Sequence, residues 1–333
     1  MYNNDIKFSL WCDFVERNFL EGEFVELIQS KSINAATSNP SIFKSAFLSS
    51  PAYAQDKAKL KGKAPKEIYE ALAIEDIKRA ASKLLPLYEQ NDDGFISIEV
   101  DPFLCDDAEA TIEEGKRLFS AINYPNVMIK VPATEAGFVA MEALLSEGIN
   151  VNATLIFSQE QTAKCLEAFK RANAVREHTQ TQGNIPQAVI SIFVSRFDRK
   201  LDDELKKIDV VTSRVGIMNA LRSYELIKSY KMENVRALFA STGVKGDILR
   251  PDYYIRELLV PNAINTAPLD TIKAFLSSSK EVNVQNIPLT VIENFFDALA
   301  ANGIHMNSVC DELMNEGLSS FKEAFIEILN ALE

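Results

Sequence analysis

Short β-rich runs alternate with helical stretches along most of the chain, and this alternation limits the fold more than any other feature of the sequence. Parallel strands need a crossover connection between them, usually a helix, so an unbroken β-then-α order predicts a parallel sheet. The expected strands are residues 8–14, 35–39, 95–100, 127–131, 151–156, 188–194, 235–240 and 262–267. The expected helices between them include residues 67–90, 106–122, 135–147, 158–178 and 212–231.

Eight βα units can close on themselves or remain an open sheet. No Gly/Pro/Ser-rich linker and no break in composition divides residues 1–333, which favours one domain formed by a closed (β/α)8 TIM barrel. An open, doubly wound sheet is the competing topology, but no GxGxxG follows a predicted strand and no GxxxxGK[ST] is present. Additional helices are expected at residues 15–30, 41–60, 290–302 and 308–332. The last has an apolar face that we expect to pack on the barrel, with a subunit contact or a cover over the strand ends as alternatives.

The charge of the chain limits its partners. With 35 Lys and Arg against 47 Asp and Glu, the formal net charge of −12 repels nucleic acid and anionic membranes. No apolar run reaches the roughly 18–20 residues of a membrane-spanning helix, and MYNNDIKFSL does not resemble a signal peptide. We therefore expect a cytoplasmic protein with neither nucleic acid nor a membrane as a partner.

Cysteine and histidine contribute little chemistry. Cys12, Cys105, Cys165 and Cys310 never form a CxxC, so we expect buried or idle thiols rather than disulfides or a zinc site. His178 and His305 are the only histidines, which excludes a zinc site built on three imidazoles. Acid, base and nucleophile roles must therefore fall to Lys, Asp, Glu, Ser, Thr or Tyr.

Lys130 places a charge inside a run that is otherwise typical of a buried strand. Parallel strands covered on both faces are nearly all hydrophobic, yet Lys130 interrupts VMIKV just before Pro132. This position is near the carboxyl end of the strand, where the active sites of such barrels lie. Burial disfavours an ammonium relative to the free amine, and a free amine can attack a ketone to form a Schiff base. The alternative is a structural lysine that pairs with a neighbouring carboxylate.

Other predicted strands carry polar groups at corresponding positions, so that these groups would face the same mouth of the barrel. Taken singly, each has an ordinary explanation as a helix cap, a surface acid, a strand filler, a small core residue or part of a solvated helix. Together, two acids, an amine and several hydroxyls are what a water-poor carbonyl site needs. The groups are Asp13, Glu99, Asn152, Thr154, Ser191 and, directly after that strand, Arg196.

The segment STGVKG at residues 241–246 follows the seventh predicted strand. Loops at this place in a barrel often bind phosphate through backbone N–H groups, and glycine permits a close approach. A chain of negative net charge needs a local positive pocket for such a ligand, which Arg196, Lys245 and Arg250 could supply. A plain turn is the alternative explanation.

Several of these segments resemble the transaldolase family, in family order. They are ATSNPSIF (36–43), SIEVDP (97–102), VMIKVPATEAG (127–137), INVNATLIFS (149–158) and ISIFVSR (190–196), and ASTGVK is most similar to the longer bacterial branch. The resemblance covers most of residues 8–270. It implies a class I aldolase barrel without metal or cofactor, which moves a dihydroxyacetone unit from sedoheptulose 7-phosphate or fructose 6-phosphate to glyceraldehyde 3-phosphate or erythrose 4-phosphate in the pentose phosphate pathway.

The resemblance also implies a role for each matching residue. Lys130 corresponds to the Schiff-base lysine, and Asp13 to the base that acts on the C4 hydroxyl. Glu99 and Thr154 correspond to the pair that handles water while the imine forms. The remaining matches concern substrate binding: Asn39 and Ser191 for the dihydroxyacetone hydroxyls, Asn152 beside them, and Arg196 and Ser241 for the phosphate.

Three positions depart from the family pattern. Ala35 stands where the family more often has Asp or Gly, and Ser195 stands where Gly is common. Many relatives have an arginine where this chain has Gly243, so Lys245 is the expected substitute in binding phosphate.

Two alternatives to a transaldolase remain open on the sequence. The first is an aldolase of the same family type that releases free dihydroxyacetone from fructose 6-phosphate. The second is a barrel without catalysis that acts as a binding protein, although the retention of Lys130, Asp13 and Glu99 argues against it. Relatives are often dimers, so a homodimer is one expectation, but the sequence decides neither the oligomeric state nor the preferred sugars.

Overall fold

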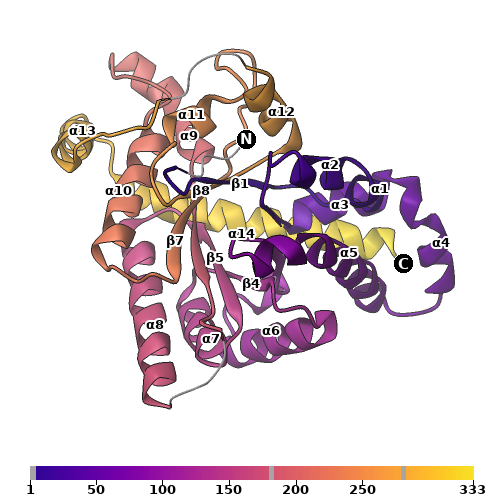
Figure 1. Ribbon diagram of the computed structural model, residues 1–333. Helices are drawn as coiled ribbons and strands as arrows, with labels where there is room; N and C mark the ends of the chain where they lie inside the picture. The colour runs from indigo at the N-terminus through magenta and orange to yellow at the C-terminus, as the bar shows by residue number, and fades with distance from the viewer. Residues whose placement is uncertain (1–4, 180–183, 279–282) are drawn as a thin grey trace.

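Eight parallel strands form a closed barrel, as the alternation of the sequence predicts. The computed structural model describes residues 5–179, 184–278 and 283–333 (Figure 1). Each strand pairs with its neighbour in chain order, and the first pairs with the last to close the sheet. The strands are β1 (Ser9–Cys12), β2 (Ala35–Thr37), β3 (Ile96–Glu99), β4 (Val127–Pro132), β5 (Asn150–Ile156), β6 (Ala188–Phe193), β7 (Val235–Ala240) and β8 (Ile264–Ala267).

Helices connect the strands and surround the barrel. Those that follow strands β3 to β8 are α6 (Ala108–Ile122), α7 (Glu135–Ser146), α8 (Gln159–His178), α9 (Ser195–Lys207), α10 (Val215–Ser229), α11 (Tyr253–Glu257) and α12 (Leu269–Ser277). The others are α1 (Arg17–Glu21), α2 (Glu23–Gln29), α3 (Pro40–Ser49), α4 (Ala54–Lys59), α5 (Pro65–Glu89), α13 (Leu289–Ala301) and α14 (Met306–Ala331). Two 3₁₀ turns span Pro51–Tyr53 and Pro102–Leu104.

Two stretches that we expected to be single helices are each divided. The expected helix 15–30 is interrupted at Gly22, which has φ −122° and ψ −101° and separates α1 from α2. The expected helix 41–60 is interrupted because Ser50 is extended and Pro51 has no N–H to continue the helical hydrogen bonds, so a 3₁₀ turn separates α3 from α4. Strands β1 and β2 end earlier than expected, at Cys12 and Thr37, so the polar residues that follow them belong to loops and caps.

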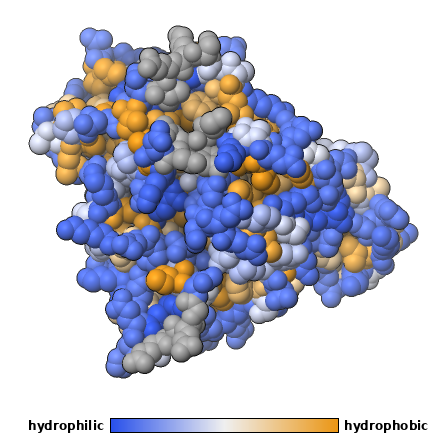
Figure 2. Space-filling model, in the orientation of Figure 1, coloured by the Kyte–Doolittle hydropathy of each residue, from blue (hydrophilic) through white to orange (hydrophobic). Residues whose placement is uncertain are grey.

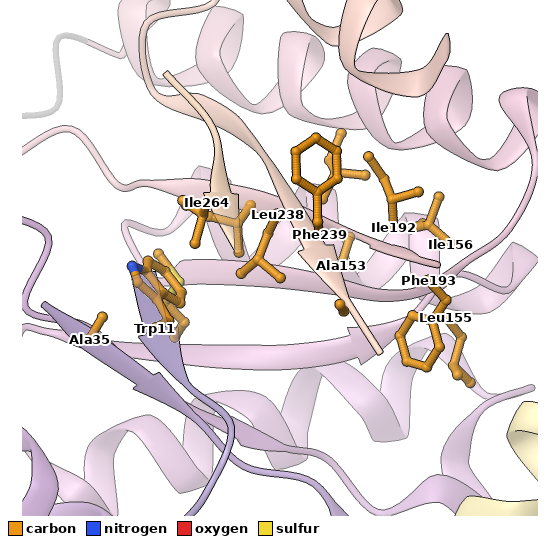
Figure 3. Packing of buried hydrophobic residues seen from close by; sticks show 14 of the residues in the cluster. Trp11, Ala35, Ala153, Leu155, Ile156, Ile192, Phe193, Leu238, Phe239 and Ile264 are labelled. Atoms are coloured by element: carbon orange, nitrogen blue, oxygen red, sulfur yellow. The ribbon is translucent and has the colours of Figure 1, made fainter. Parts of the chain in front are cut away.

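The barrel is packed with apolar side chains. Trp11 and Leu10 of β1 are fully buried, and Leu238, Phe239 and Ile264 pack within the same cluster (Figure 3). Apart from half-buried Arg236 in β7, every residue of the eight strands is buried, as expected for parallel strands covered on both faces. All four cysteines are free and buried. The strands therefore form a solid core that fixes the groups at their carboxyl ends.

Helix α14 crosses the molecule toward α5 and carries the C-terminus there (Figure 1). It contacts α3, α5, α9 and β5, so its apolar face is covered by the barrel and its surrounding helices. The face of the protein seen in Figure 2 is mainly hydrophilic with scattered apolar patches. In the described part of the chain, no helix combines the length and apolar character needed to cross a bilayer.

Candidate active site

A cavity of about 710 Å³ lies at the carboxyl ends of the strands. Eight of the eleven candidate residues of the sequence line it: Asp13, Asn39, Lys130, Asn152, Ser191, Arg196, Ser241 and Lys245. Glu99 and Thr154 do not line this cavity but are buried beside it on β3 and β5. A second cavity, of about 840 Å³, lies at the opposite end near Arg236 and Asn262, and none of the eleven candidate residues lines it.

Lys130 projects from β4 into a site with little water. Its side chain is 6% exposed, and its Nζ lies 3.6 Å from Glu99 Oε2. The ammonium donates a hydrogen bond of 3.2 Å to the carbonyl oxygen of Ser38 and lies 5.9 Å from the centre of the Phe321 ring. The strand register explains this contact, because Glu99 and Lys130 are direct partners on β3 and β4. An amine and an acid therefore meet where a carbonyl substrate can reach the amine.

Glu99 is a buried acid whose surroundings disfavour its charged form. Burial raises the pKa of Glu99 to about 7, although the charge of Lys130 acts in the opposite direction. Neither Glu99 carboxylate oxygen nor the Thr154 hydroxyl has a hydrogen-bond partner in the described part of the chain. Buried polar atoms are nearly always paired, so these three oxygens are available to a reacting hydroxyl or a water. With this pKa, Glu99 can both donate and accept a proton near neutral pH.

Asp13 lies on the other side of the site, just after β1. Its Oδ1 accepts a hydrogen bond of 2.7 Å from Thr37 Oγ1, which also contacts Thr266 Oγ1 at 2.7 Å. Burial raises the pKa of Asp13, whereas Lys130 and the Thr37 hydrogen bond lower it. A neighbouring lysine favours the ionised form of Asp13, but burial is the larger effect and the net shift of its pKa is upward. The two acids therefore contact different neighbours, and Asp13 alone is oriented by a threonine.

A chain of hydrogen bonds orients the amide and hydroxyl groups on the wall of the cavity. Ser191 Oγ donates to Asn152 Oδ1 at 2.6 Å, and Asn152 Nδ2 donates to Ser97 Oγ at 3.0 Å. Asn152 is thus fixed, and Ser191 retains its oxygen lone pairs for a ligand hydroxyl. Asn39 caps α3 by accepting from the Ile42 N–H at 3.0 Å, which leaves its NH₂ as the donor for a ligand.

Positive charge gathers on the wall formed by α9 and the loop after β7. The Arg196 guanidinium lies 5.2 Å from the centre of the Phe193 ring, and burial lowers the pKa of Arg196. Ser241 has a left-handed backbone with φ 55°, and its hydroxyl lies 3.1 Å from that of Ser195. Lys245 is exposed and also lines the cavity. Non-glycine residues in this backbone region are uncommon and cluster at functional sites.

Arg250 does not join this group. Its guanidinium forms an ion pair of 3.2 Å with Asp252, and the residue does not line the cavity. The sequence offered it as a third phosphate-binding cation, but the neighbouring acid two residues later holds it elsewhere.

Helix α14 covers part of the cavity, which was one of the alternatives that the sequence left open for this helix. Ser320 and Phe321 line it. The helix approaches β5 closely at Gly317, where an added Cβ would lie 2.9 Å from Leu155 Cδ2 and 3.3 Å from Arg196 Nη1. Leu155 itself has φ 58° at a register shift between β5 and β6, so the strand is bent where the helix crosses it.

Several lining residues were not predicted from the sequence. The apolar ones resemble ordinary core residues, the threonines resemble ordinary strand residues, and the arginine belongs to a charge-dense helix. These residues are Phe14, Thr37, Thr266, Phe193, Arg199, Ser320 and Phe321. Among the described residues, no three His, Cys, Asp or Glu side chains gather as a metal site would require, and His178 and His305 lie at helix ends away from the cavity.

Comparison with known proteins gives a consistent result over nearly the whole chain. The model of the family described as Transaldolase/Fructose-6-phosphate aldolase matches residues 10–332. A transaldolase of Campylobacter jejuni subsp. doylei is 51% identical over 336 residues, covering 98% of this chain and 99% of that protein. A transaldolase of Helicobacter pylori is 44% identical over 326 residues, with the same coverage.

Proposed function

Since the chain belongs to the transaldolase/fructose-6-phosphate aldolase family, we propose that it is a transaldolase whose Schiff-base lysine is Lys130. Its substrates are phosphorylated sugars: a ketose phosphate such as sedoheptulose 7-phosphate or fructose 6-phosphate gives up a dihydroxyacetone unit to an aldose phosphate, as in the pentose phosphate pathway. The observation that carries this proposal is the buried contact of 3.6 Å between Lys130 Nζ and Glu99 Oε2.

The reaction begins at the C2 carbonyl of the ketose. The neutral Lys130 amine attacks C2, and the carbinolamine then loses its hydroxyl as water to give a protonated imine. The departing hydroxyl needs a proton, which Glu99 can supply because its pKa is near 7. The proposal assigns the departing water to Thr154, and the buried Thr154 hydroxyl, which has no partner in the described chain, supports this role.

Cleavage of the C3–C4 bond requires a base at the C4 hydroxyl. Asp13 takes this proton, the C3–C4 electron pair moves toward the protonated imine, and the aldose phosphate leaves as an aldehyde. The carbanion at C3 is thereby stabilised as an enamine. Thr37 orients the Asp13 carboxylate by its 2.7 Å hydrogen bond, so that one oxygen remains for the substrate.

The bound dihydroxyacetone unit then waits for an acceptor aldehyde. Asn39 and Ser191 hold its hydroxyls, and Asn152 fixes Ser191. Attack of the enamine on the acceptor returns a proton from Asp13 to the new C4 hydroxyl, and water releases the product ketose from Lys130. Arg196, Ser241 and Lys245 bind the phosphate at the far end of the cavity.

Trapping with borohydride tests the central step. Borohydride reduces the imine formed with fructose 6-phosphate to a secondary amine, so mass spectrometry of peptides should locate a permanent sugar adduct on Lys130. An unmodified Lys130 peptide after this treatment would contradict both the transaldolase and the aldolase function and favour a binding protein.

Product analysis separates the two enzyme functions. A transaldolase should produce a new ketose only when an acceptor such as erythrose 4-phosphate or glyceraldehyde 3-phosphate is present. Stoichiometric free dihydroxyacetone from fructose 6-phosphate without an acceptor would instead identify an aldolase.

A further inference from the structure

Arg196 and Arg199 differ from the other arginines of the protein. In the described chain every other arginine donates to a carboxylate or to a backbone carbonyl. Across those same residues 5–179, 184–278 and 283–333, Arg196 and Arg199 form no ion pair and no hydrogen bond. Both line the cavity at the carboxyl ends of the strands.

The position of this pair is unfavourable in the free protein. Arg196 and Arg199 lie three residues apart near the start of α9, so their side chains are neighbours on one helix face. Like charges at this spacing repel, and the charge of Arg199 contributes to the lowered pKa of Arg196. Cations at the N-terminal end of a helix also oppose its dipole. An anion in the cavity would relieve both effects.

Two acids close to these arginines in the chain or in the fold, Asp198 and Glu316, have other hydrogen-bond or ion-pair partners. Asp198 accepts hydrogen bonds from the Gly216 N–H at 2.9 Å and from the Tyr254 hydroxyl at 2.8 Å. The charge of Glu316 on α14 acts to raise the pKa of Arg196, but this carboxylate forms its ion pair with Lys200, at 2.8 Å, and not with either arginine. The two guanidinium groups are therefore directed to the cavity without a carboxylate of their own.

The loop after β7 leaves no room for a long cation at residue 243. A Cβ at Gly243 would lie 2.9 Å from Pro268 Cγ, and a proline ring cannot rotate away as a flexible side chain would. A second guanidinium for an anion must therefore come from another part of the wall. Arg199 supplies one, and its planar fork of donors fits two phosphate oxygens at once.

We propose that Arg199 binds the phosphate of the sugar substrate together with Arg196, and that it determines the preference for phosphorylated over unphosphorylated substrates. This inference rests on the proposed function for the identity of the sugar. The binding of a phosphate group itself does not depend on turnover and can be measured separately.

Substitution of Arg199 tests the proposal in the full-length chain. Arg199→Gln should raise the KM for fructose 6-phosphate about tenfold and weaken inhibition by inorganic phosphate by a similar factor, because one charge-assisted hydrogen-bonding group is lost. Arg199→Lys should have an intermediate effect, since it keeps the charge but not the fork. Arg171→Gln, which removes an arginine on α8 that pairs with Glu142, is the matched control and should change neither value.

A comparison of two ketones distinguishes phosphate binding from a structural role. At subsaturating concentration, Arg199→Gln should lower the borohydride adduct of fructose 6-phosphate on Lys130 about tenfold relative to the adduct of dihydroxyacetone, which has no phosphate. Equal losses for both ketones would overturn the proposal, because they would indicate a distorted site. The proposal would also be overturned if Arg199→Gln kept the wild-type KM and the wild-type inhibition by phosphate while Lys245→Gln raised the KM and weakened the inhibition. That result would assign the role to Lys245.

Failure of the proposed function would give a different result. If the wild-type protein formed no adduct with fructose 6-phosphate, the function would be wrong. Binding of inorganic phosphate, measured by calorimetry in wild type and Arg199→Gln, would still support Arg199 as an anion-binding residue if the affinity fell about tenfold. Equal affinities in the two proteins would overturn that assignment.

Discussion

Replacement of Glu99 by glutamine should change how the stability of the protein depends on pH. Glu99 is buried next to Lys130, and its pKa is about 7 in the folded protein, raised from 4.5 by burial. The unfolded chain exposes this carboxyl to water, where it titrates near 4.5. Between these two values the folded state keeps a proton that the unfolded state has lost, and this difference links folding to pH.

The sign of the effect follows from proton binding. Where the folded state binds more protons, the free energy of unfolding falls as pH rises, so the stability associated with protonated Glu99 is present below pH 4.5 and is lost as pH rises through about 7. A shift of about 2.5 units corresponds to about 3 kcal/mol, at 1.36 kcal/mol for each unit. Glutamine cannot titrate, so Glu99→Gln should not show this loss.

Denaturant unfolding at several values between pH 4.5 and pH 8.5 measures the effect. The quantity to follow is the unfolding free energy of Glu99→Gln minus that of the wild type, because other titrating groups largely cancel in this difference. The substitution also removes the partner of Lys130, which shifts this difference by a constant amount at every pH. The expected result is therefore the change of the difference with pH: it should rise by about 3 kcal/mol as pH increases. Glu113→Gln, at an exposed position of α6, is the control and should show no rise. A difference that stays constant within about 1 kcal/mol would refute the reasoning.

Three further substitutions test other parts of the site. Lys130→Ala should abolish turnover in steady-state assays while far-UV circular dichroism stays unchanged, and activity within about tenfold of wild type, or about 1.4 kcal/mol of barrier, would contradict its role as nucleophile. Arg196→Ala should mainly raise the KM for phosphorylated sugars, and unchanged KM values would move the phosphate site elsewhere. Gly317→Ala should lower the unfolding free energy by about 1–2 kcal/mol and raise the same KM, because the new methyl group meets Leu155 Cδ2 at 2.9 Å and Arg196 Nη1 at 3.3 Å. Gly22→Ala is its control, because a Cβ there would lie 3.5 Å from its nearest neighbour, the Asn18 carbonyl oxygen. Equal changes of unfolding free energy and KM in the two glycine variants would contradict the predicted effect of the Gly317 contacts.

The barrel could be predicted because its strands are buried on both faces. Such strands need continuous apolar runs, and these runs stand out from the amphipathic helices between them, so all eight strands fall where the sequence places them. The ends of the elements depend on local contacts that periodicity does not report. The interruptions at Gly22 and Pro51 and the short helix α11 are of this kind, because single backbone geometries decide them rather than a pattern.

The part of the site that could be predicted from the sequence consists mainly of polar residues within the strands. Lys130, Asn152 and Ser191 stand out because an apolar strand has no structural use for them, and all three line the cavity. Phe321 and Arg199 gave no comparable signal. A phenylalanine on an amphipathic helix is expected in any core, and an arginine on a charged helix is expected in solvent, so only the placement of α14 and α9 at the mouth shows that both face the cavity.

The positions of the two acids explain how such a site can hold an enamine without losing it to a stray proton. Glu99 lies 3.6 Å from the nitrogen of Lys130. In the proposed mechanism it therefore acts on the water that leaves and returns at C2, and not on the carbon that carries the enamine charge. Asp13 accepts a hydrogen bond from Thr37 on the other side of the site. In the proposed mechanism it receives its proton from the C4 hydroxyl of the departing sugar. The same proton returns to the new C4 hydroxyl when the acceptor reacts. Its transfer to C3 of the enamine would instead end the reaction as free dihydroxyacetone. The Phe321 ring of α14 lies 5.9 Å from the Lys130 amine and restricts water there, and neither His178 nor His305 lines the cavity as a further donor. If the proposed roles hold, this division between one acid that acts at nitrogen and one that acts at oxygen favours transfer to an acceptor over release of free dihydroxyacetone.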